Sequence, residues 1–257
     1  MQFRSNIRHI LLLTILLGVV CLLAITLEGS EINSITQIEI TGNKFLSEGQ
    51  YIKFAQLENV ENSSEMSTTL IRDRLEKHPY IKNIDVLMIE RGIAKVKIYE
   101  KKIDAILLSN TKQFMITNNA EIIPLIVSTK NIDLPVIVSN RKENQTEIFG
   151  NAAKNEKLFC ALKIISAAEV YDRQLYESIS EINLDTGNNI FIQLTDFASP
   201  IYFGVGLEVE KTVFLSKVFK HLKGNKLTDY LKYVDLRFTD LVYLGLDEQL
   251  TTQKETI

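Results

Sequence analysis

The sequence contains no tryptophan and has only two cysteines, four prolines and three histidines among its 257 residues. Two cysteines are too few for a disulfide framework. We expect Cys21 and Cys160 to remain unpaired, as small buried side chains. The formal net charge of −3 leaves no excess of Lys and Arg of the kind that nucleic-acid-binding proteins carry. Nucleic acid is therefore not an expected partner.

Motifs for enzymatic chemistry are also missing. The sequence contains no GxSxG, P-loop, GxGxxG or HExxH pattern. His9, His78 and His221 have no carboxylate or cysteine at the spacing of a catalytic triad or a metal site. We expect His78 and His221 to be ordinary capping or surface residues. The sequence predicts no enzyme, no cofactor and no bound metal.

An uncharged apolar run, ILLLTILLGVVCLLAITL, covers residues 10–27. As a helix it spans roughly 27 Å, close to the ~30 Å hydrocarbon core of a bilayer. Arg4 and Arg8 precede the run and Glu28 follows it. Because the positive flank stays inside, the sequence predicts a single-pass inner-membrane anchor with residues 1–9 in the cytoplasm.

Two other interpretations of the apolar run stay open. A cleaved signal peptide has a small-residue A-x-A site, and none is clear after this run. A lipoprotein signal ending at Cys21 has a small residue before the cysteine, where this chain has Val20. Both fit the run less well than an anchor does.

Residues 35–103, which follow a connector over 28–34, are predicted to form a small α+β domain. Ile38 and Ile40 alternate with polar residues as in a strand, and Pro79 ends a helix. The expected order is strand, helix, helix, strand and strand, over residues 35–43, 47–57, 65–78, 80–90 and 93–100. Two helices can then cover one face of three strands.

Residues 104–246 are predicted to form a larger, β-rich α+β domain with a sheet covered on one face. The expected strands cover residues 105–109, 113–117, 121–127, 134–138, 179–185, 189–195 and 201–207, and the expected helices cover 152–171 and 208–223. The segment VDLRFTDLVYLG, residues 234–245, alternates like two further strands, at 234–238 and 241–244. The polar residues 247–257 are expected to be a disordered tail.

The stretch HPYIKNIDVLMIERGIAKVKIYEKKIDA, residues 78–105, resembles the FtsQ/DivIB family of bacterial cell-division proteins, and the βααββ order resembles a POTRA domain. The segments TNNAEIIPL, LPVIVSN, YFGVGLEVEKTVFLSKVFKHL and KYVDLRFTD are similar to the family in the same order. The positions assigned to structural motifs are Gly42, Asn43, Pro79, Glu100, Leu134 and Pro135. Arg91 and Ile103 stand where the family usually has proline, which leaves the angle between the domains open.

The resemblance implies a non-catalytic scaffold in the inner membrane at the division septum, with both folded domains in the periplasm. It implies binding to the single-span proteins FtsB and FtsL and, through them, to the septal peptidoglycan synthase. Self-association stays open. The alternative is a POTRA-bearing subunit of another envelope secretion or assembly complex.

The last strand raises the question of what it pairs with, because an open sheet edge is a hazard unless it is blocked or used. In strand addition, a partner segment hydrogen-bonds to such an edge. The predicted partner-binding residues are Arg237, Phe238, Thr239, Asp240, Leu241, Val242, Tyr243 and Leu244, with Arg237 contributing an ion pair. The alternative is a purely structural role, in which these residues only complete the sheet and its core.

Overall fold

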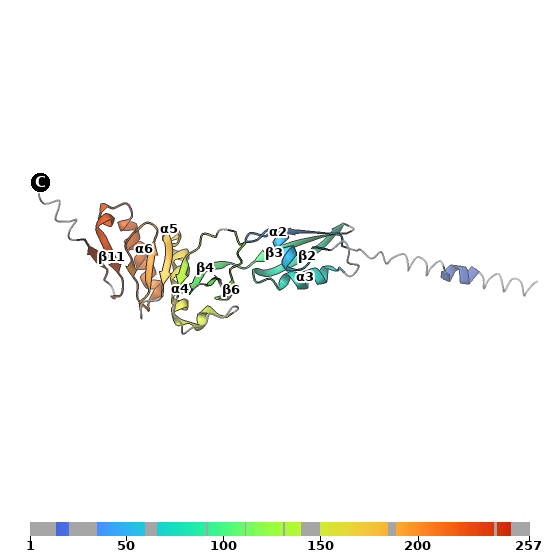
Figure 1. The fold of residues 1–257 in the computed structure, drawn as a ribbon, viewed down its shortest axis with the longest axis horizontal. Coiled ribbons are helices and arrows are strands. Elements are labelled where there is room, and N and C mark those ends of the chain that lie inside the picture. The colour runs from blue at the N-terminus through green and yellow to red at the C-terminus, as the bar shows by residue number, and fades with distance from the viewer. Residues whose placement is uncertain are drawn as a thin grey trace, which may run out of the picture.

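The computed structural model describes residues 14–20, 35–59, 66–90, 92–110, 112–130, 132–139, 150–184, 189–238 and 241–247. Beyond the helical residues 14–20 they form two α+β domains in succession, which confirms the α+β part of the predicted fold class (Figure 1). Within these ranges, no helix has the length and apolar character needed to cross a bilayer. Most of the predicted anchor, residues 10–27, lies outside the described residues, as does Cys21.

The N-terminal domain has a three-stranded sheet in the order β1-β3-β2. Strand β1 (Gln37–Thr41) runs parallel to β3 (Ile93–Glu100), and β2 (Ile81–Glu90) forms an antiparallel hairpin with β3. Helices α2 (Glu48–Phe54) and α3 (Thr68–Glu76) supply Tyr51, Ile71 and Leu75 to the core. Because alternate residues of β1 and β3 are buried, the helices cover one face and leave the other to solvent.

Glu100, at the end of β3, fastens the loop between β1 and α2. Its carboxylate accepts hydrogen bonds from the N–H groups of Lys44 (2.9 Å) and Phe45 (3.1 Å) and from the Tyr51 hydroxyl (2.5 Å). Burial and the Glu100 charge raise the pKa of Tyr51 well above its usual range. Asn43 donates its side-chain N–H to the Leu46 carbonyl at 2.9 Å. Asn43 and Glu100, two of the positions singled out in the sequence, thus organise one loop.

The sequence predicts a capping or surface position for His78, but in the structure its side chain lies in the core and is only 2% exposed. Its ring contacts those of Tyr51, Phe54 and Tyr80 at centroid distances of 4.7, 4.4 and 5.1 Å. Its Nδ1 accepts a hydrogen bond from the Tyr80 N–H at 3.1 Å, whereas Nε2 is buried without a partner among the described residues. Burial, reinforced by nearby Lys101, lowers the pKa of His78 to about 4. His221, by contrast, is exposed as expected.

The buried imidazole makes the stability of the N-terminal domain depend on pH. An unfolded histidine binds a proton below about pH 6.5, whereas folded His78 does so only near pH 4. Stability from this group is therefore lost as pH falls from about 6.5 toward 4, by about 2 kcal/mol between pH 7 and pH 5. Urea unfolding at the two pH values measures the loss. His78→Asn keeps an acceptor for the Tyr80 N–H but cannot titrate, so a variant that loses as much stability as the wild type would contradict this account.

The larger domain has a nine-stranded sheet in the order β12-β11-β10-β9-β8-β7-β4-β5-β6. The strands are β4 (Ile103–Ser109), β5 (Lys112–Thr117), β6 (Ile122–Pro124), β7 (Val136–Val138), β8 (Ile179–Asn183), β9 (Phe191–Leu194), β10 (Ile201–Tyr202), β11 (Leu231–Asp235) and β12 (Tyr243–Leu246). Helices α4 (Glu156–Tyr171) and α6 (Glu208–Leu222) pack together on the sheet and close a single core. Cys160 is buried in α4, as expected, and is a free thiol.

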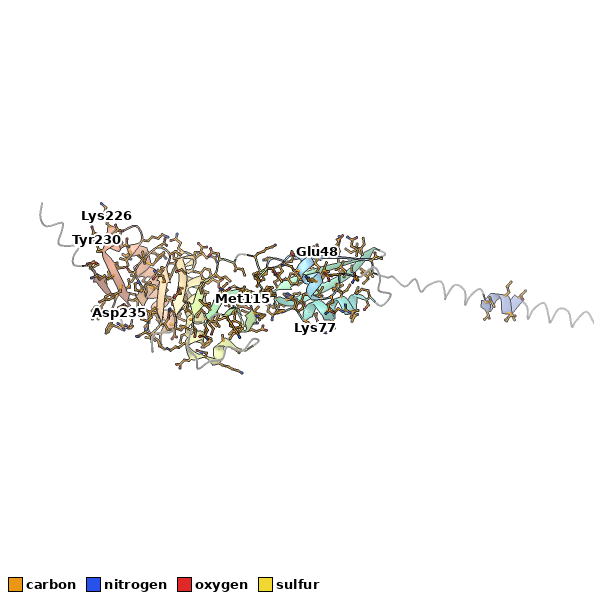
Figure 2. All side chains as sticks on the ribbon, viewed as in Figure 1. Glu48, Lys77, Met115, Lys226, Tyr230 and Asp235 are labelled. Carbon is orange, nitrogen blue, oxygen red and sulfur yellow. The ribbon has the colours of Figure 1, made fainter. Side chains whose placement is uncertain are left out.

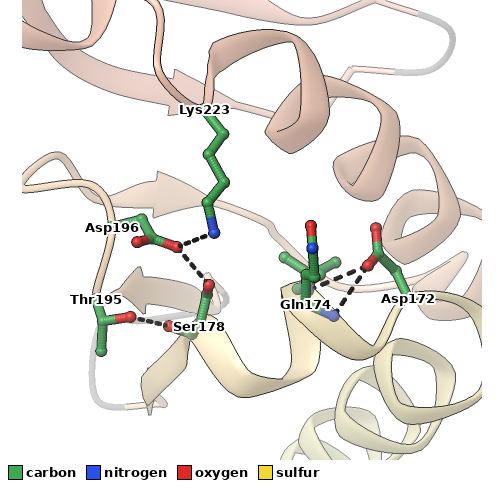
Figure 3. Close-up of polar contacts among 7 residues, drawn as sticks. Asp172, Gln174, Ser178, Thr195, Asp196 and Lys223 are labelled. Atoms are coloured by element: carbon green, nitrogen blue, oxygen red, sulfur yellow. Dashed lines mark hydrogen bonds and ion pairs between the residues drawn. The ribbon is translucent and has the colours of Figure 1, made fainter.

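Several elements of this domain differ from the prediction, and two of the differences have a clear local cause. Strand β10 stops after Tyr202 instead of reaching residue 207, because Gly204 and Gly206 have φ values of +73° and +86° and turn the chain away from the sheet. A further helix, α5 (Arg173–Ser178), follows α4 directly. The buried Asp172 carboxylate caps α5 by accepting the N–H groups of Gln174 and Leu175 (Figure 3). It also accepts a hydrogen bond from the Ser216 hydroxyl.

Figure 3 also shows how α5 is joined to the sheet. Asp196 accepts hydrogen bonds from the Ser178 hydroxyl at 2.6 Å and from the Lys223 ammonium at 3.2 Å. These bonds lower the pKa of Asp196. The end of α5, the loop after β9 and the end of α6 are thereby held at one point.

The two domains share part of a core. Met115, between the domains in Figure 2, is buried with Ile123 in the N-terminal core, whereas Phe114 belongs to the larger one. The Tyr80 hydroxyl oxygen accepts a hydrogen bond from the Ile126 N–H at 2.8 Å and lies 2.7 Å from the Thr129 hydroxyl. These contacts fix the junction that the missing prolines had left open.

Candidate partner-binding edge

Strand β12 forms one edge of the nine-stranded sheet. It pairs antiparallel with β11, and Figure 1 places β11 at the end of the larger domain that is remote from the N-terminal domain. The Asp247 N–H donates to the Tyr230 carbonyl at 2.8 Å. Because backbone groups alternate along an antiparallel strand, Leu244 and Leu246 turn their N–H and C=O groups to the open side of the sheet.

The side chains along this edge are unusually apolar for a surface. Phe238, Leu241 and Tyr243 are exposed, and the rings of Phe238 and Tyr243 meet edge to face at 4.9 Å. Leu244 and Leu246 are each 38% exposed, although their cross-strand partners Val234 and Leu231 are buried in the core. The hydrophobic core thus extends to β12, where its last side chains are left half exposed. A further strand beside β12 would cover them. This surface, called the β12 edge below, consists of Phe238, Leu241, Tyr243, Leu244 and Leu246.

The segment before the edge differs from the prediction, because the strand expected over 234–238 ends at Asp235. The Asp235 carboxylate accepts the backbone N–H of Arg237 at 3.0 Å, which turns the chain out of the sheet. The same carboxylate pairs with the Arg237 guanidinium at 2.9 and 2.5 Å, and these hydrogen bonds lower the pKa of Asp235. The guanidinium also lies over the Tyr202 ring at 5.1 Å. Arg237 therefore has a structural ion pair within the chain.

Gly245 is a feature that sequence reasoning did not single out. A Cβ at this position would lie 2.3 Å from the ring of Tyr233, its cross-strand partner. The Tyr233 ring contacts Tyr202 at 5.3 Å, which in turn contacts Phe191 at 4.9 Å. An aromatic row on the sheet thus ends over Gly245, and the absent side chain lets β12 lie flat against β11.

The predicted site residues are distributed as follows. Phe238, Leu241, Tyr243 and Leu244 gather at the edge, and Val242 is partly buried against the core. Thr239 and Asp240 lie outside the described residues. Leu134 packs on the N-terminal core and the Pro135 carbonyl accepts from the Ile106 N–H, so these two motif positions belong to the junction.

In the part of the chain that the structure describes, no group of three His, Cys, Asp or Glu side chains is placed to hold a metal ion. The buried carboxylates of Asp172 and Glu208 serve structural contacts. Glu208 accepts the Gly206 N–H at 2.8 Å and a hydrogen bond from Cys160, while burial and this bond raise the pKa of the thiol to about 11.

The fold defines a two-domain α+β protein in which a small βααββ module precedes a large sheet with an open edge. The family profile "POTRA domain, FtsQ-type" matches residues 33–89, and the profile "Cell division protein FtsQ/DivIB, C-terminal" matches residues 105–237, just over half of the chain. The chain belongs to the FtsQ/DivIB family of non-catalytic cell-division proteins.

Among solved structures, the chain is similar to the major extracytoplasmic domain of the trans isomer of the cell-division protein DivIB from Geobacillus stearothermophilus. The two are 13% identical, with a TM-score of 0.32, over 49% of this chain and 98% of that one. None of the curated proteins matches this chain.

Proposed function

We propose that this protein is a non-enzymatic scaffold of the division machinery that links early and late division proteins at the septum. Residues 10–27 anchor it in the inner membrane, and its larger domain binds FtsB- and FtsL-type single-span proteins in the periplasm. Family membership supports the division role. The observation that carries the binding site is the β12 edge, where a sheet and its core both stop at half-exposed leucines.

Strand addition would satisfy both the open backbone groups and the half-exposed side chains of this edge. A partner strand would take up the outward N–H and C=O groups of Leu244 and Leu246, and its side chains would cover the same leucines. Each main-chain hydrogen bond contributes about 1 kcal/mol net, and the apolar cover adds to it. Arg237, whose side chain is 40% exposed, remains accessible to a partner carboxylate while it pairs with Asp235.

A pair of substitutions at Leu244 tests strand addition against simple side-chain contact. Leu244→Pro removes the outward N–H, and proline is tolerated where an edge strand turns that group to solvent. Leu244→Ala removes the same side chain but keeps the donor. Since an unmade hydrogen bond in a buried interface costs about 1–3 kcal/mol, we expect the proline variant to bind an FtsB-type outer segment roughly tenfold or more weakly than the alanine variant.

Calorimetric titration of residues 28–257 with that segment measures the difference. Circular dichroism of both variants serves as the folding control. Equal affinities for folded Leu244→Pro and Leu244→Ala would mean that the partner does not pair with this edge.

A further inference from the structure

The far end of the N-terminal domain has an apolar tip that the proposed partner site does not use. Leu87, Met88 and Ile89, near the end of β2, are 65%, 37% and 53% exposed. Three consecutive apolar residues alternate between the two faces of a strand. The tip therefore presents apolar side chains on both faces of the sheet. The helices of this domain pack on one face only, so they cannot cover all of them.

The surroundings of this tip are polar. On the solvent face, Leu87 lies opposite Lys95, which pairs with Glu39 at 3.8 Å. On the helix face, Met88 lies opposite Ala94, where the core ends. Lys95 lies beside Leu87 on the neighbouring strand. A lysine at this level can bury its aliphatic stem while its ammonium stays among the lipid headgroups, so it is compatible with apolar side chains that enter a bilayer surface.

The chain enters the domain at this same tip. The N–H groups of Thr36 and Gln37 both donate to the Gly92 carbonyl, at 2.7 and 2.9 Å, in the turn that follows β2. In Figure 1, β2 and β3 run to the end of the domain that faces away from the larger domain. Only the seven residues 28–34 separate Ile35 from the predicted anchor. Fully extended, they reach at most about 25 Å.

We infer that the β2–β3 hairpin tip, through Leu87, Met88 and Ile89, inserts into the outer surface of the membrane that holds residues 10–27. The inference rests on the predicted anchor and is independent of the β12 edge. Insertion is shallow, because β2 is an edge strand whose open backbone groups need water. The tip then reaches the boundary between headgroups and acyl chains, and the larger domain extends away from the bilayer.

The absence of tryptophan offers a direct test. Leu87→Trp places a lone tryptophan at the tip, Tyr99→Trp places one at the other end of the hairpin, and Ile15→Trp places one in the predicted anchor. Positions 87 and 99 are both exposed, so these substitutions leave the core intact. Each full-length variant is reconstituted in vesicles of phosphatidylethanolamine and phosphatidylglycerol, with and without bromine atoms on the acyl chains near the headgroups.

Bromine quenches tryptophan only at short range. We expect Leu87→Trp and Ile15→Trp to lose most of their fluorescence in brominated vesicles. Leu87 lies opposite Lys95, so Tyr99→Trp is about 13 Å farther along the hairpin and should lose far less. Quenching of Ile15→Trp without quenching of Leu87→Trp would overturn the inference while leaving the anchor intact. Absence of quenching at both positions would overturn the anchor and the inference together, without bearing on the β12 edge.

Discussion

A chain that ends at Phe238 is expected to lose its affinity for an FtsB-type outer segment, whereas one that ends at Asp247 is expected to keep it. The first variant lacks β12, and the second lacks only the polar tail. Leu244 and Leu246 offer four outward backbone groups between them, each worth about 1 kcal/mol net when paired with a partner strand. Their loss predicts roughly a thousandfold weaker binding.

The shorter chain should still fold, which makes the comparison informative. Strand β11 keeps its parallel pairing with β10, at Ile201 with Val234, and Leu236 stays available to the core. Titration of both chains with the same segment measures the affinity, and hydrogen exchange of the β10 and β11 amides checks the fold. If the chain ending at Phe238 is protected from exchange and binds as the longer one does, the partner site lies outside β12.

Most elements of the fold could be predicted because strand alternation and helix-ending residues are signals carried by neighbouring residues. Strand β3 was recognised from Val96 and Ile98 against Lys95 and Lys97, and the structure buries the first pair and exposes the second. The predicted helix over 152–171 ends at Tyr171, as α4 does, but the short helix α5 after it was not predicted. Its start depends on the side-chain cap that Asp172 provides, and six residues are too few to show a helical pattern.

Residues with two environments were the hardest to predict. Strand β5 buries Phe114 toward one core and Met115 toward the other, so it lacks the alternation of a half-exposed strand. His78 is expected to be a capping or surface residue, and it is buried because the rings of Tyr51 and Phe54, from α2, pack on it together with the nearby Tyr80.

The sequence indicated that the last strand lies at a sheet edge, but not where that strand begins or why it contains Gly245. Apolar alternation near the end of the chain indicated a last strand, and β12 does lie at the sheet edge. Its start at Tyr243 could not be read from the pattern, because the preceding strand ends through the hydrogen bond between Asp235 and the Arg237 N–H. The role of Gly245 depends on the ring of its cross-strand partner Tyr233. This pairing is known only once the register of β11 and β12 is known.

Replacing Gly42 by alanine is expected to destabilise the N-terminal domain by about 3 kcal/mol or more. Gly42 has a φ of +85°, which costs a residue with a Cβ about 1–2 kcal/mol. The new Cβ would also lie 2.3 Å from the Ile98 carbonyl oxygen, a backbone atom of β3 that cannot move without disturbing the sheet. The turn that leads from β1 to the Glu100 contacts would therefore have to distort.

Gly49 provides the matched control, since it lies seven residues away in α2 and nothing stands within 4 Å of a Cβ placed there. Gly49→Ala should stabilise the domain by about 0.5–1 kcal/mol, because alanine loses less backbone entropy in a helix. The same chemical change thus has opposite signs at the two sites. Urea unfolding of both variants in the chain over residues 28–257 measures them. If Gly42→Ala is as stable as Gly49→Ala, the turn after β1 can relax to accommodate the new Cβ. The Glu100 contacts with the loop would then not require glycine at position 42.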